Sequence, residues 1–122
     1  MKLKAVNKNT EFNRAYRRGQ SFVDKTCVLY VIKNRCGHAR FGITASKKVG
    51  NAVKRNRARR VIRESVRQLG IDPNQSIDII IVARSRTPYV KQQVVYGQLK
   101  ALCEKAGIIP AEKTEQVVPT AE

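Results

Sequence analysis

The sequence predicts a single α/β domain of the α+β type, a sandwich in which helices pack on a mixed four-stranded sheet in the order αβββαβα. Its 122 residues match the size of one domain, and 42% of them are hydrophobic, which is enough for an ordinary core. Apolar runs of strand length alternate with segments of helical periodicity. The longest apolar runs, at residues 27–32 and 79–83, are far shorter than a membrane span.

Residues 9–19 are predicted to form a short helix. Its apolar residues share one face at i, i+3 and i+4 spacing: Phe12, Ala15 and Tyr16. Asn9 or Thr10 is expected to cap the N-terminus, because a short polar side chain can accept hydrogen bonds from the exposed N–H groups. Gly19 is expected to end the helix in the left-handed conformation.

Three strands are predicted next, at residues 21–24, 27–34 and 39–46. The second of them is rich in the branched residues that favour strands. In the third, apolar residues occupy alternate positions: Phe41, Ile43 and Ala45. This alternation indicates a strand with one buried face. Residues 34–39 are predicted to form a hairpin turn between the second and third strands.

The basic segment that follows is predicted to form a helix that ends at Gly70, before a turn at residues 72–74. At about 100° per residue, one side of this helix carries the residues expected to face the core. They are Ala58, Val61, Ile62, Ser65 and Leu69. The opposite side carries polar and basic residues, which are Asn56, Arg60, Arg63 and Arg67, with Arg59 beside them. The helix is therefore expected to bury one face and expose the other.

A fourth strand is predicted at residues 76–84, where the apolar residues of one face are Ile77, Ile79, Ile81 and Ala83. A last helix is predicted at residues 87–107. Thr87 is expected to cap it, Pro88 suits its first turn, and Gly107 is expected to end it.

The folded domain is predicted to cover residues 1–108, and residues 109–122 are predicted to form a disordered tail. The N-terminal sequence lacks the apolar segment of a signal peptide. The three cysteines, Cys27, Cys36 and Cys103, are widely spaced and form no CxxC pair, so reduced thiols are expected. Together these features predict a cytoplasmic protein.

The charge of the chain is concentrated in one segment. The chain has 25 Lys and Arg residues against 9 Asp and Glu, a net charge of +16. Residues 47–67 contain nine basic residues and one acid, Glu64, and their net charge of +8 is half of the whole excess. A merely solvated helix would alternate the two signs, so a polyanionic partner, nucleic acid first, explains the segment better. A membrane surface is the weaker alternative, because the apolar face has no Trp or Phe to anchor it.

No catalytic residues are predicted in the protein itself. A nuclease site would need clustered carboxylates for metal ions or a pair of histidines. The single histidine, His38, falls in a predicted turn, and the acids are scattered, with Asp24 and Asp78 in separate strands. Neither a metal site nor a phosphate-binding glycine loop is predicted.

Two kinds of binding surface are left. The arginine face offers planar donors that suit phosphate groups. Phe12, Tyr16 and Tyr30 could stack on unpaired bases, but they could also be ordinary core residues, and spacing alone favours the core. Insertion of the basic helix into a DNA groove is not expected, because strands flank it where a short turn and a second helix would be needed.

Residues 41–64, "FGITASKKVGNAVKRNRARRVIRE", resemble the signature of the bacterial ribonuclease P protein subunit. The Arg-Asn-Arg element of that family is present at residues 55–57, after a Ser-Lys-Lys-x-Gly-Asn-Ala-Val segment at residues 46–53. The resemblance extends over roughly residues 8–106. It implies a ribosomal-protein-like sandwich with a left-handed crossover through the basic helix, which general statistics would not predict.

The resemblance also implies two sets of RNA-binding residues. The set implied to bind the 5′ leader of precursor transfer RNA, in a cleft between the first helix and the sheet, is Phe12, Tyr16, Tyr30, Ser46, Lys47, Lys48, Asn51, Arg55 and Asn56. The set implied to bind the catalytic RNA is Lys54, Arg57, Arg59, Arg60, Arg63 and Arg67. Tyr16 stands where the family more commonly has Phe, a change that keeps the stacking ring and adds a hydroxyl.

The function that the resemblance implies is that of a noncatalytic protein subunit of ribonuclease P. Its partners would be the RNase P RNA subunit and precursor tRNA, and neither DNA nor a membrane. The RNA would cleave the leader to give the mature 5′ end, with Mg²⁺ held mainly by the RNA subunit and the substrate. Two alternatives stay open on the residues: a ribosomal or RNA-chaperone type of basic RNA-binding protein, and a protein-only nuclease.

Overall fold

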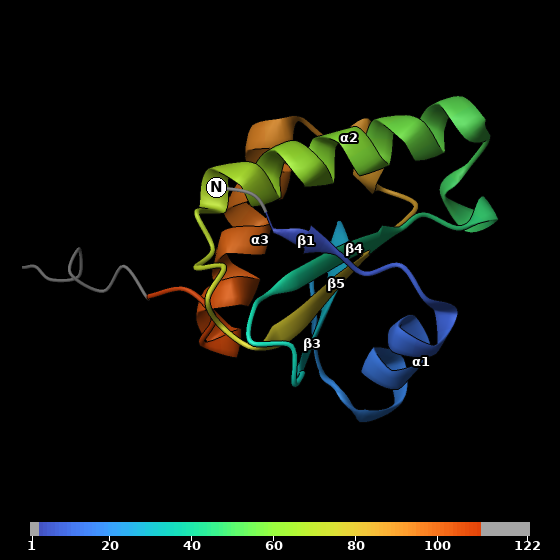
Figure 1. Ribbon diagram of the computed structural model, residues 1–122. Helices are drawn as coiled ribbons and strands as arrows, with labels where there is room; N and C mark the ends of the chain where they lie inside the picture. The colour runs from blue at the N-terminus through green and yellow to red at the C-terminus, as the bar shows by residue number, and fades with distance from the viewer. Residues whose placement is uncertain (1–2, 111–122) are drawn as a thin grey trace, which may run out of the picture.

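The computed structural model describes residues 3–110, which form one α/β domain with a five-stranded mixed sheet and three α-helices (Figure 1). The strands are β1 (Lys4–Ala5), β2 (Gln20–Val23), β3 (Cys27–Lys33), β4 (Arg40–Thr44) and β5 (Ile77–Ala83). The helices are α1 (Asn9–Arg18), α2 (Ala52–Leu69) and α3 (Gln92–Ala106), with short 3-10 turns η1 (Lys47–Val49) and η2 (Thr87–Tyr89). The predicted fold class is confirmed, but the sheet has five strands rather than four.

The additional strand, β1, lies at an edge of the sheet. It pairs in parallel with β4, so that Lys4 lies opposite Arg40 and Ala5 opposite Phe41. A strand of two residues is too short to show the alternation by which strands are recognised in a sequence. The strand is identified only by its pairing with β4 in the folded structure.

The order of strands in the sheet is β1-β4-β5-β3-β2. The central strand β5 is parallel to β4 and antiparallel to β3. The prediction that residues 34–39 form a hairpin turn between β3 and β4 is therefore wrong, because β5 is inserted between these two strands. The nearly unbroken apolar sequence of β5 suits a strand that is covered on both faces. Helix α2 connects the parallel neighbours β4 and β5 as a crossover.

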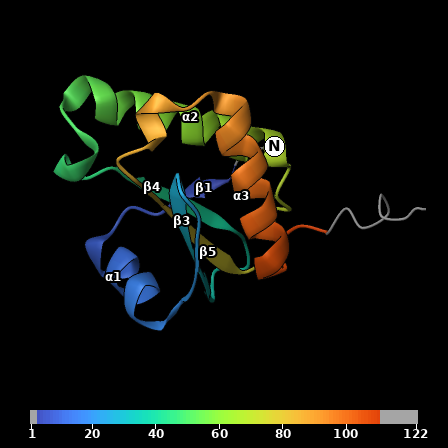
Figure 2. The ribbon, with the colours of Figure 1, turned by 180° about the vertical axis from the view of Figure 1, so that it is seen from behind.

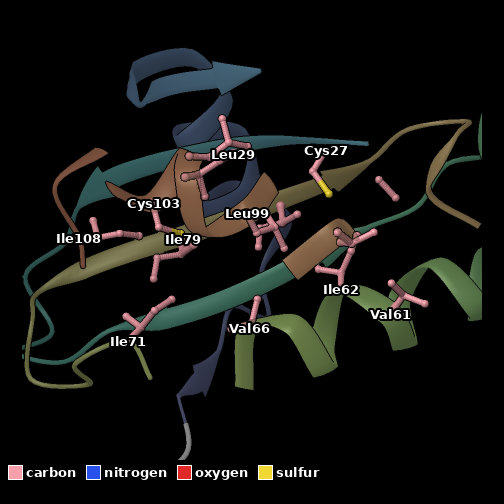
Figure 3. Close-up of a cluster of buried hydrophobic side chains, with 14 of the residues drawn as sticks. Cys27, Leu29, Val61, Ile62, Val66, Ile71, Ile79, Leu99, Cys103 and Ile108 are labelled. Atoms are coloured by element: carbon pink, nitrogen blue, oxygen red, sulfur yellow. The ribbon is translucent and has the colours of Figure 1, made fainter. Parts of the chain in front are cut away.

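Helices cover both faces of the sheet, with α2 and α3 on one face and α1 on the other (Figures 1 and 2). Because side chains of a strand alternate, Ile79 and Ile81 of β5 belong to the core under α2 and α3, whereas Ile80 belongs to the core under α1. The core under α2 and α3 is the larger one and also contains Ile62 and Leu99 (Figure 3). The smaller core under α1 consists of Val6, Ala15 and Ile80, with Phe12, Tyr30, Ile32 and Val82 packed against it.

Helix α2 follows the prediction closely. Four of its five predicted core residues are buried, namely Ala58, Val61, Ile62 and Ser65, and the fifth, Leu69, is partly buried. Asn51 caps the N-terminus, and Gly70 ends the helix in the left-handed conformation with a φ of 64°. The hydroxyl of Ser65 donates a hydrogen bond of 2.9 Å to the carbonyl oxygen of Val61, so its burial leaves no polar group unpaired.

Both ends of α1 differ from the prediction. Lys8 is the N-cap residue, and Asn9 and Thr10 lie inside the first turn. Gly19 has a φ of −76°, so it does not adopt the left-handed conformation. A glycine is needed there for another reason, since a Cβ at this position would lie 2.6 Å from the carbonyl oxygen of Ala15.

Helix α3 begins later than predicted, at Gln92. Thr87 is not its cap but is buried in η2, where its hydroxyl oxygen accepts a hydrogen bond of 3.0 Å from the N–H of Arg84 and its hydroxyl donates to the carbonyl oxygen of Thr26. The predicted end of the helix at Gly107 is confirmed by a φ of 76°.

The chain continues into the large core after α3. Ile108 and Ile109 are buried there, and the side-chain amide of Gln75 donates a hydrogen bond of 3.1 Å to the carbonyl oxygen of Ile108. From residue 111 onwards, the predicted disordered tail lies outside the described residues.

Candidate nucleic-acid interface

Three aromatic side chains gather where α1 crosses the sheet. The rings of Tyr16 and Tyr30 meet edge to face with their centroids 5.0 Å apart, and the centroids of Phe12 and Tyr16 are 6.5 Å apart. The Tyr16 hydroxyl donates a 3.5 Å hydrogen bond to the hydroxyl oxygen of Thr44 on β4. Tyr16 is 37% exposed, whereas Phe12 and Tyr30 are half-buried. An exposed ring supported from below by a second ring is suited to stacking against a base.

Phe12 is mainly a packing residue, unlike Tyr16. Its ring lies against Gly42 of β4, because a Cβ added to Gly42 would come within 2.7 Å of the Cζ atom of the Phe12 ring. The missing side chain at Gly42 therefore makes room for the ring. Of the two aromatic residues on α1, Phe12 joins the helix to the sheet and Tyr16 remains available at the surface.

A buried ionic cluster also holds α1 on the sheet. Arg40 binds Asp78 through two hydrogen bonds of 2.8 Å each, and its third bond, of 2.7 Å, reaches Glu11 on α1. The side-chain amide of Asn34 donates a 2.8 Å hydrogen bond to the same Asp78 carboxylate, which is only 1% exposed. Because each charge in the cluster has partners, its burial fixes the position of α1 instead of opposing folding.

The cluster shifts the pKa values of its acids. Burial by itself would raise the pKa of Asp78, but hydrogen bonds from Arg40 and Asn34 outweigh burial and hold that pKa below its ordinary value of 3.8. The hydrogen bond from Arg40 lowers the pKa of Glu11 from its ordinary value of 4.5. In the sequence, Asp78 is recognisable only as a single acid in a predicted strand. A lone acid inside an apolar strand was nevertheless a signal for a buried partner.

Two residues of the expected leader-binding set are helix caps. The hydroxyl oxygen of Ser46 accepts a 3.3 Å hydrogen bond from the N–H of Lys48 and caps η1. The side-chain oxygen of Asn51 accepts a 3.0 Å hydrogen bond from the N–H of Lys54 and caps α2. These contacts give Ser46 and Asn51 a structural role that the resemblance alone did not indicate.

The end of β4 connects the aromatic residues with the basic segment: Tyr16 contacts Thr44, and the basic segment begins a few residues after Thr44. Thr44, the partner of Tyr16, precedes Ser46 by two residues, and η1 begins directly after Ser46. The side chains of Lys47 and Lys48 in η1 are exposed. A stacking surface and a cationic turn are thus joined by one short connection.

Arg55, in the first turn of α2, is half-buried. Its Nε atom is buried and has no hydrogen-bond partner among residues 3–110. Asn56 is exposed, and its side-chain oxygen accepts a 3.1 Å hydrogen bond from Arg59. A buried donor without a partner is rare in folded proteins.

The outer face of α2 carries arginines that have few partners within the chain. Arg60 and Arg63 are exposed and make no hydrogen bond or ion pair within residues 3–110. Arg67 pairs with Glu64, but the two side chains are 69% and 41% exposed. Water and salt weaken such an exposed pair, so Arg67 can exchange its partner at small cost. This face can therefore meet a series of phosphate groups.

Two basic residues at the start of α2 contact η2. The Nε atom of Arg57 donates a 2.7 Å hydrogen bond to the carbonyl oxygen of Pro88. The Nζ atom of Lys54 lies 5.1 Å from the centroid of the Tyr89 ring, at the distance of a cation–π contact. The sequence pattern does not indicate a role for Tyr89, because this residue falls in the first turn of the predicted last helix.

Within residues 3–110, His, Cys, Asp and Glu side chains nowhere form a group of three or more that could hold a metal ion. Burial raises the pKa of the Cys27 and Cys103 thiols to about 12, and His38 lies in the turn beside the carbonyl oxygen of Ala39. None of the helices in this part of the chain is long and apolar enough to cross a membrane.

Comparison with known proteins finds close relatives of this chain. The family model described as Ribonuclease P matches residues 1–107. The ribonuclease P protein component of Clostridium botulinum strain Loch Maree is 42% identical over 109 residues, which cover 88% of this chain and 98% of the relative. The same component of Clostridioides difficile is 42% identical over 107 residues, covering 86% of this chain and 93% of the relative.

Solved structures agree with these relatives. The RNase P protein of Staphylococcus aureus superposes with a TM-score of 0.75 at 33% identity, covering 88% of this chain and 99% of that protein. The RNase P protein of Thermotoga maritima has a TM-score of 0.72 at 25% identity, covering 84% of this chain and 96% of that protein. The chain therefore belongs to the family of ribonuclease P protein components.

Proposed function

We propose that this chain is the noncatalytic subunit of ribonuclease P and binds both the catalytic RNA and the 5′ leader of precursor tRNA. The observation that supports this division of labour is the junction at η1 and the start of α2. There, the exposed ring of Tyr16 reaches from α1 to Thr44 at the end of β4. Thr44 is followed in the chain by the exposed Lys47 and Lys48 and by Arg55, whose Nε atom has no hydrogen-bond partner within residues 3–110. A single-stranded RNA needs both elements, a surface for its bases and charges for its phosphates.

The leader-binding part of the proposal concerns the α1 side of the sheet. Bases of the leader stack on Tyr16, which Tyr30 supports, and phosphates of the leader contact Lys47, Lys48 and Arg55. Stacking and phosphate contacts tolerate any base, and this suits an enzyme whose precursor substrates differ in leader sequence.

The second part of the proposal concerns the outer face of α2. The arginines on that face that have no strong partner within residues 3–110, among them Arg60 and Arg63, bind phosphates of the catalytic RNA. The protein thereby holds two polyanions together that would otherwise repel each other. In this proposal Mg²⁺ is held by the RNA subunit and the substrate, and the holoenzyme works in the cytoplasm.

Reconstitution tests the proposal. Precursor tRNA is incubated with the protein alone, with the cognate RNA subunit alone, and with both together, each in the presence of Mg²⁺. We expect no cleavage by the protein alone, and the protein should strengthen binding and cleavage of the precursor at the mature 5′ end when it is added to the RNA.

Two results would contradict the proposal in different ways. Cleavage by a protein preparation shown to be free of RNA would contradict its noncatalytic role. A protein that binds RNA but leaves binding and cleavage of the precursor by the RNA subunit unchanged would instead be an RNA chaperone or ribosomal type of protein, for which the charge alone would suffice.

A further inference from the structure

Tyr89 is a large aromatic residue that neither proposed RNA-binding surface uses. Its side chain is 66% exposed, and Val53, which precedes Lys54 on α2, is 76% exposed. Single exposed apolar residues are common on protein surfaces and need no explanation by themselves. Tyr89 differs from an ordinary exposed residue in how it is held and in what surrounds it.

The turn that carries Tyr89 is firmly anchored. Thr87 and Pro88 are buried, and the hydrogen bonds of the Thr87 hydroxyl to the backbone of Arg84 and Thr26 attach η2 to the rest of the fold. η2 packs against α2, and Figure 2 shows the segment between β5 and α3 lying along that helix. The Tyr89 ring is thus presented to solvent by a rigid support, so little conformational freedom is lost when it binds a partner.

One cation lies over the ring, and another contacts the residue that precedes it in the chain. Lys54 places its Nζ atom 5.1 Å from the ring centroid, and Arg57 is held to the adjacent Pro88 by the 2.7 Å hydrogen bond from its Nε atom. The other two guanidinium nitrogens of Arg57 have no hydrogen-bond partner within residues 3–110, so they are available to a phosphate. Residues 84–91 add three basic residues and no acid.

We propose that Tyr89 is a stacking platform for an unpaired base of the catalytic RNA, with Lys54 and Arg57 bound to the phosphates on either side of that base. This inference rests on the proposed function, because its occupant is the RNA that the basic face of α2 binds. The platform is separate from the leader site, since η2 packs against α2 whereas Tyr16 and Tyr30 belong to the face covered by α1.

A single-stranded segment of RNA accounts for both parts of this site. The flat ring matches the face of a base, and the flanking cations match phosphates. A membrane would call for several large apolar or aromatic anchors, and the exposed large apolar residue that α2 carries is only a valine, Val53.

The test uses the full chain with Tyr89→Ala, Tyr89→Leu and Tyr89→Phe, and measures equilibrium binding to the cognate ribonuclease P RNA at several salt concentrations. The Ala and Leu variants should bind roughly 5- to 150-fold more weakly, the range expected when one stacked base is lost, whereas Phe should keep wild-type affinity. The dependence of affinity on salt should not change in these variants, because no charge is removed. In Arg57→Ala the log–log slope should fall by up to about 0.7 to 0.9.

Controls separate stacking from other roles of Tyr89. Val94→Ala removes an exposed apolar side chain from α3, and it should not alter binding. If Tyr89→Ala lowers the melting temperature, the RNA affinities of the Leu and Phe variants show whether stacking is responsible. Both side chains fill similar space, and only Phe can stack. The affinity of Tyr89→Leu for the RNA subunit is also measured in the presence of a precursor with a long leader and of one with a short leader. The loss of affinity should be the same with both precursors, because the leader does not contact this site.

Four results would overturn the inference. Ala and Leu variants that bind the RNA subunit like the wild type would exclude a stacking role, and a Phe variant as weak as Ala would assign the effect to the hydroxyl. Variants that keep RNA binding but lose binding to vesicles of anionic lipid would assign the ring to a membrane surface. A wild-type protein that does not bind the RNA subunit would refute the proposed function itself, and with it this site.

Discussion

The two faces of the sheet differ in how the surfaces above them are built. On the α1 face, a small core, a T-shaped ring pair and a buried ionic cluster fix the shape of the surface. On the other face, a large apolar core supports α2, and the outer side of that helix carries arginines with few partners. The first surface is determined by packing, and the second by unpaired charge.

This difference predicts that mutations on the two faces act differently. A surface built by packing can select a ligand by geometry, but its residues are tied to the stability of the fold. A surface of free arginines contributes affinity and fast association, which depend on salt, and its residues can be removed without harm to the fold. Variants on both faces test this contrast.

The largest expected effect is on stability, from Asp78→Ala on the α1 face. Removal of this carboxylate leaves Arg40 largely buried, with Glu11 as its remaining ionic partner, and should reduce the free energy of unfolding by about 3 to 5 kcal/mol. Urea denaturation at neutral pH measures this loss in the free energy of unfolding. The control is Glu64→Gln, which breaks the exposed ion pair with Arg67 on α2 and should leave the urea midpoint unchanged. Equal losses in the two variants would remove the contrast between the faces.

Tyr16→Ala should weaken binding of a precursor with a long leader by about 1 to 3 kcal/mol, because one stacked base is lost. The holoenzyme should bind a precursor with almost no leader as before, and the melting temperature of the protein should stay near that of the wild type. Binding of the two precursors is compared by titration with the holoenzyme.

Phe12→Ala is the matched control for Tyr16. It should destabilise the protein, though by less than the roughly 3 to 5 kcal/mol of a fully buried Phe, because the ring is only half-buried. If Tyr16→Ala instead lost stability as Phe12→Ala does and affected both precursors alike, Tyr16 would be a core residue.

On the α2 face, Arg60→Ala combined with Arg63→Ala should weaken binding to the RNA subunit and leave the fold intact. The log–log slope of affinity against salt should fall by up to about 0.7 to 0.9 for each lost phosphate contact. Arg35→Ala combined with Lys105→Ala removes the same charge from exposed residues outside α2 and is the control. A slope that both double variants lower equally would mean that net charge, and not this face, attracts the RNA.

The smallest expected effect is the pH dependence of the ionic cluster. The pKa of Glu11 is lowered in the folded protein, mainly by the hydrogen bond from Arg40, so its contribution to stability is complete above its ordinary pKa of 4.5. That contribution is lost as the pH falls through the lowered folded pKa. The difference in free energy of unfolding between the wild type and Glu11→Gln should be less than roughly 1 kcal/mol. It should stay constant from neutral pH to about pH 5 and become smaller in more acidic solution. A difference that grows with acidity would contradict this assignment.

Part of the candidate site was predictable from the sequence, and part was not. The spacing of Phe12 and Tyr16 placed both rings on one face of a helix, but it could not distinguish a packed ring from an exposed one. That distinction depends on Gly42, a residue of β4 far away in the chain that makes room for the ring of Phe12. The exposure of Tyr89 was not predictable either, because it depends on a residue far away in the chain: the hydrogen bond from Thr87 to Thr26 anchors the turn that carries Tyr89.

The sequence by itself determined the elements whose pattern is local. The buried stripe of α2, the two faces of β5 and the helix ends at Gly70 and Gly107 all follow from periodicity or from the freedom of glycine, which act within a few residues. Only the tertiary structure decided which strands are neighbours, where β1 pairs, and that Asp78 meets Arg40. Strand neighbours are chosen by competition among all strands of the chain for the central, doubly covered position. The most apolar strand, β5, occupies that position, although it follows the others in the chain, and it thereby separates β3 from β4.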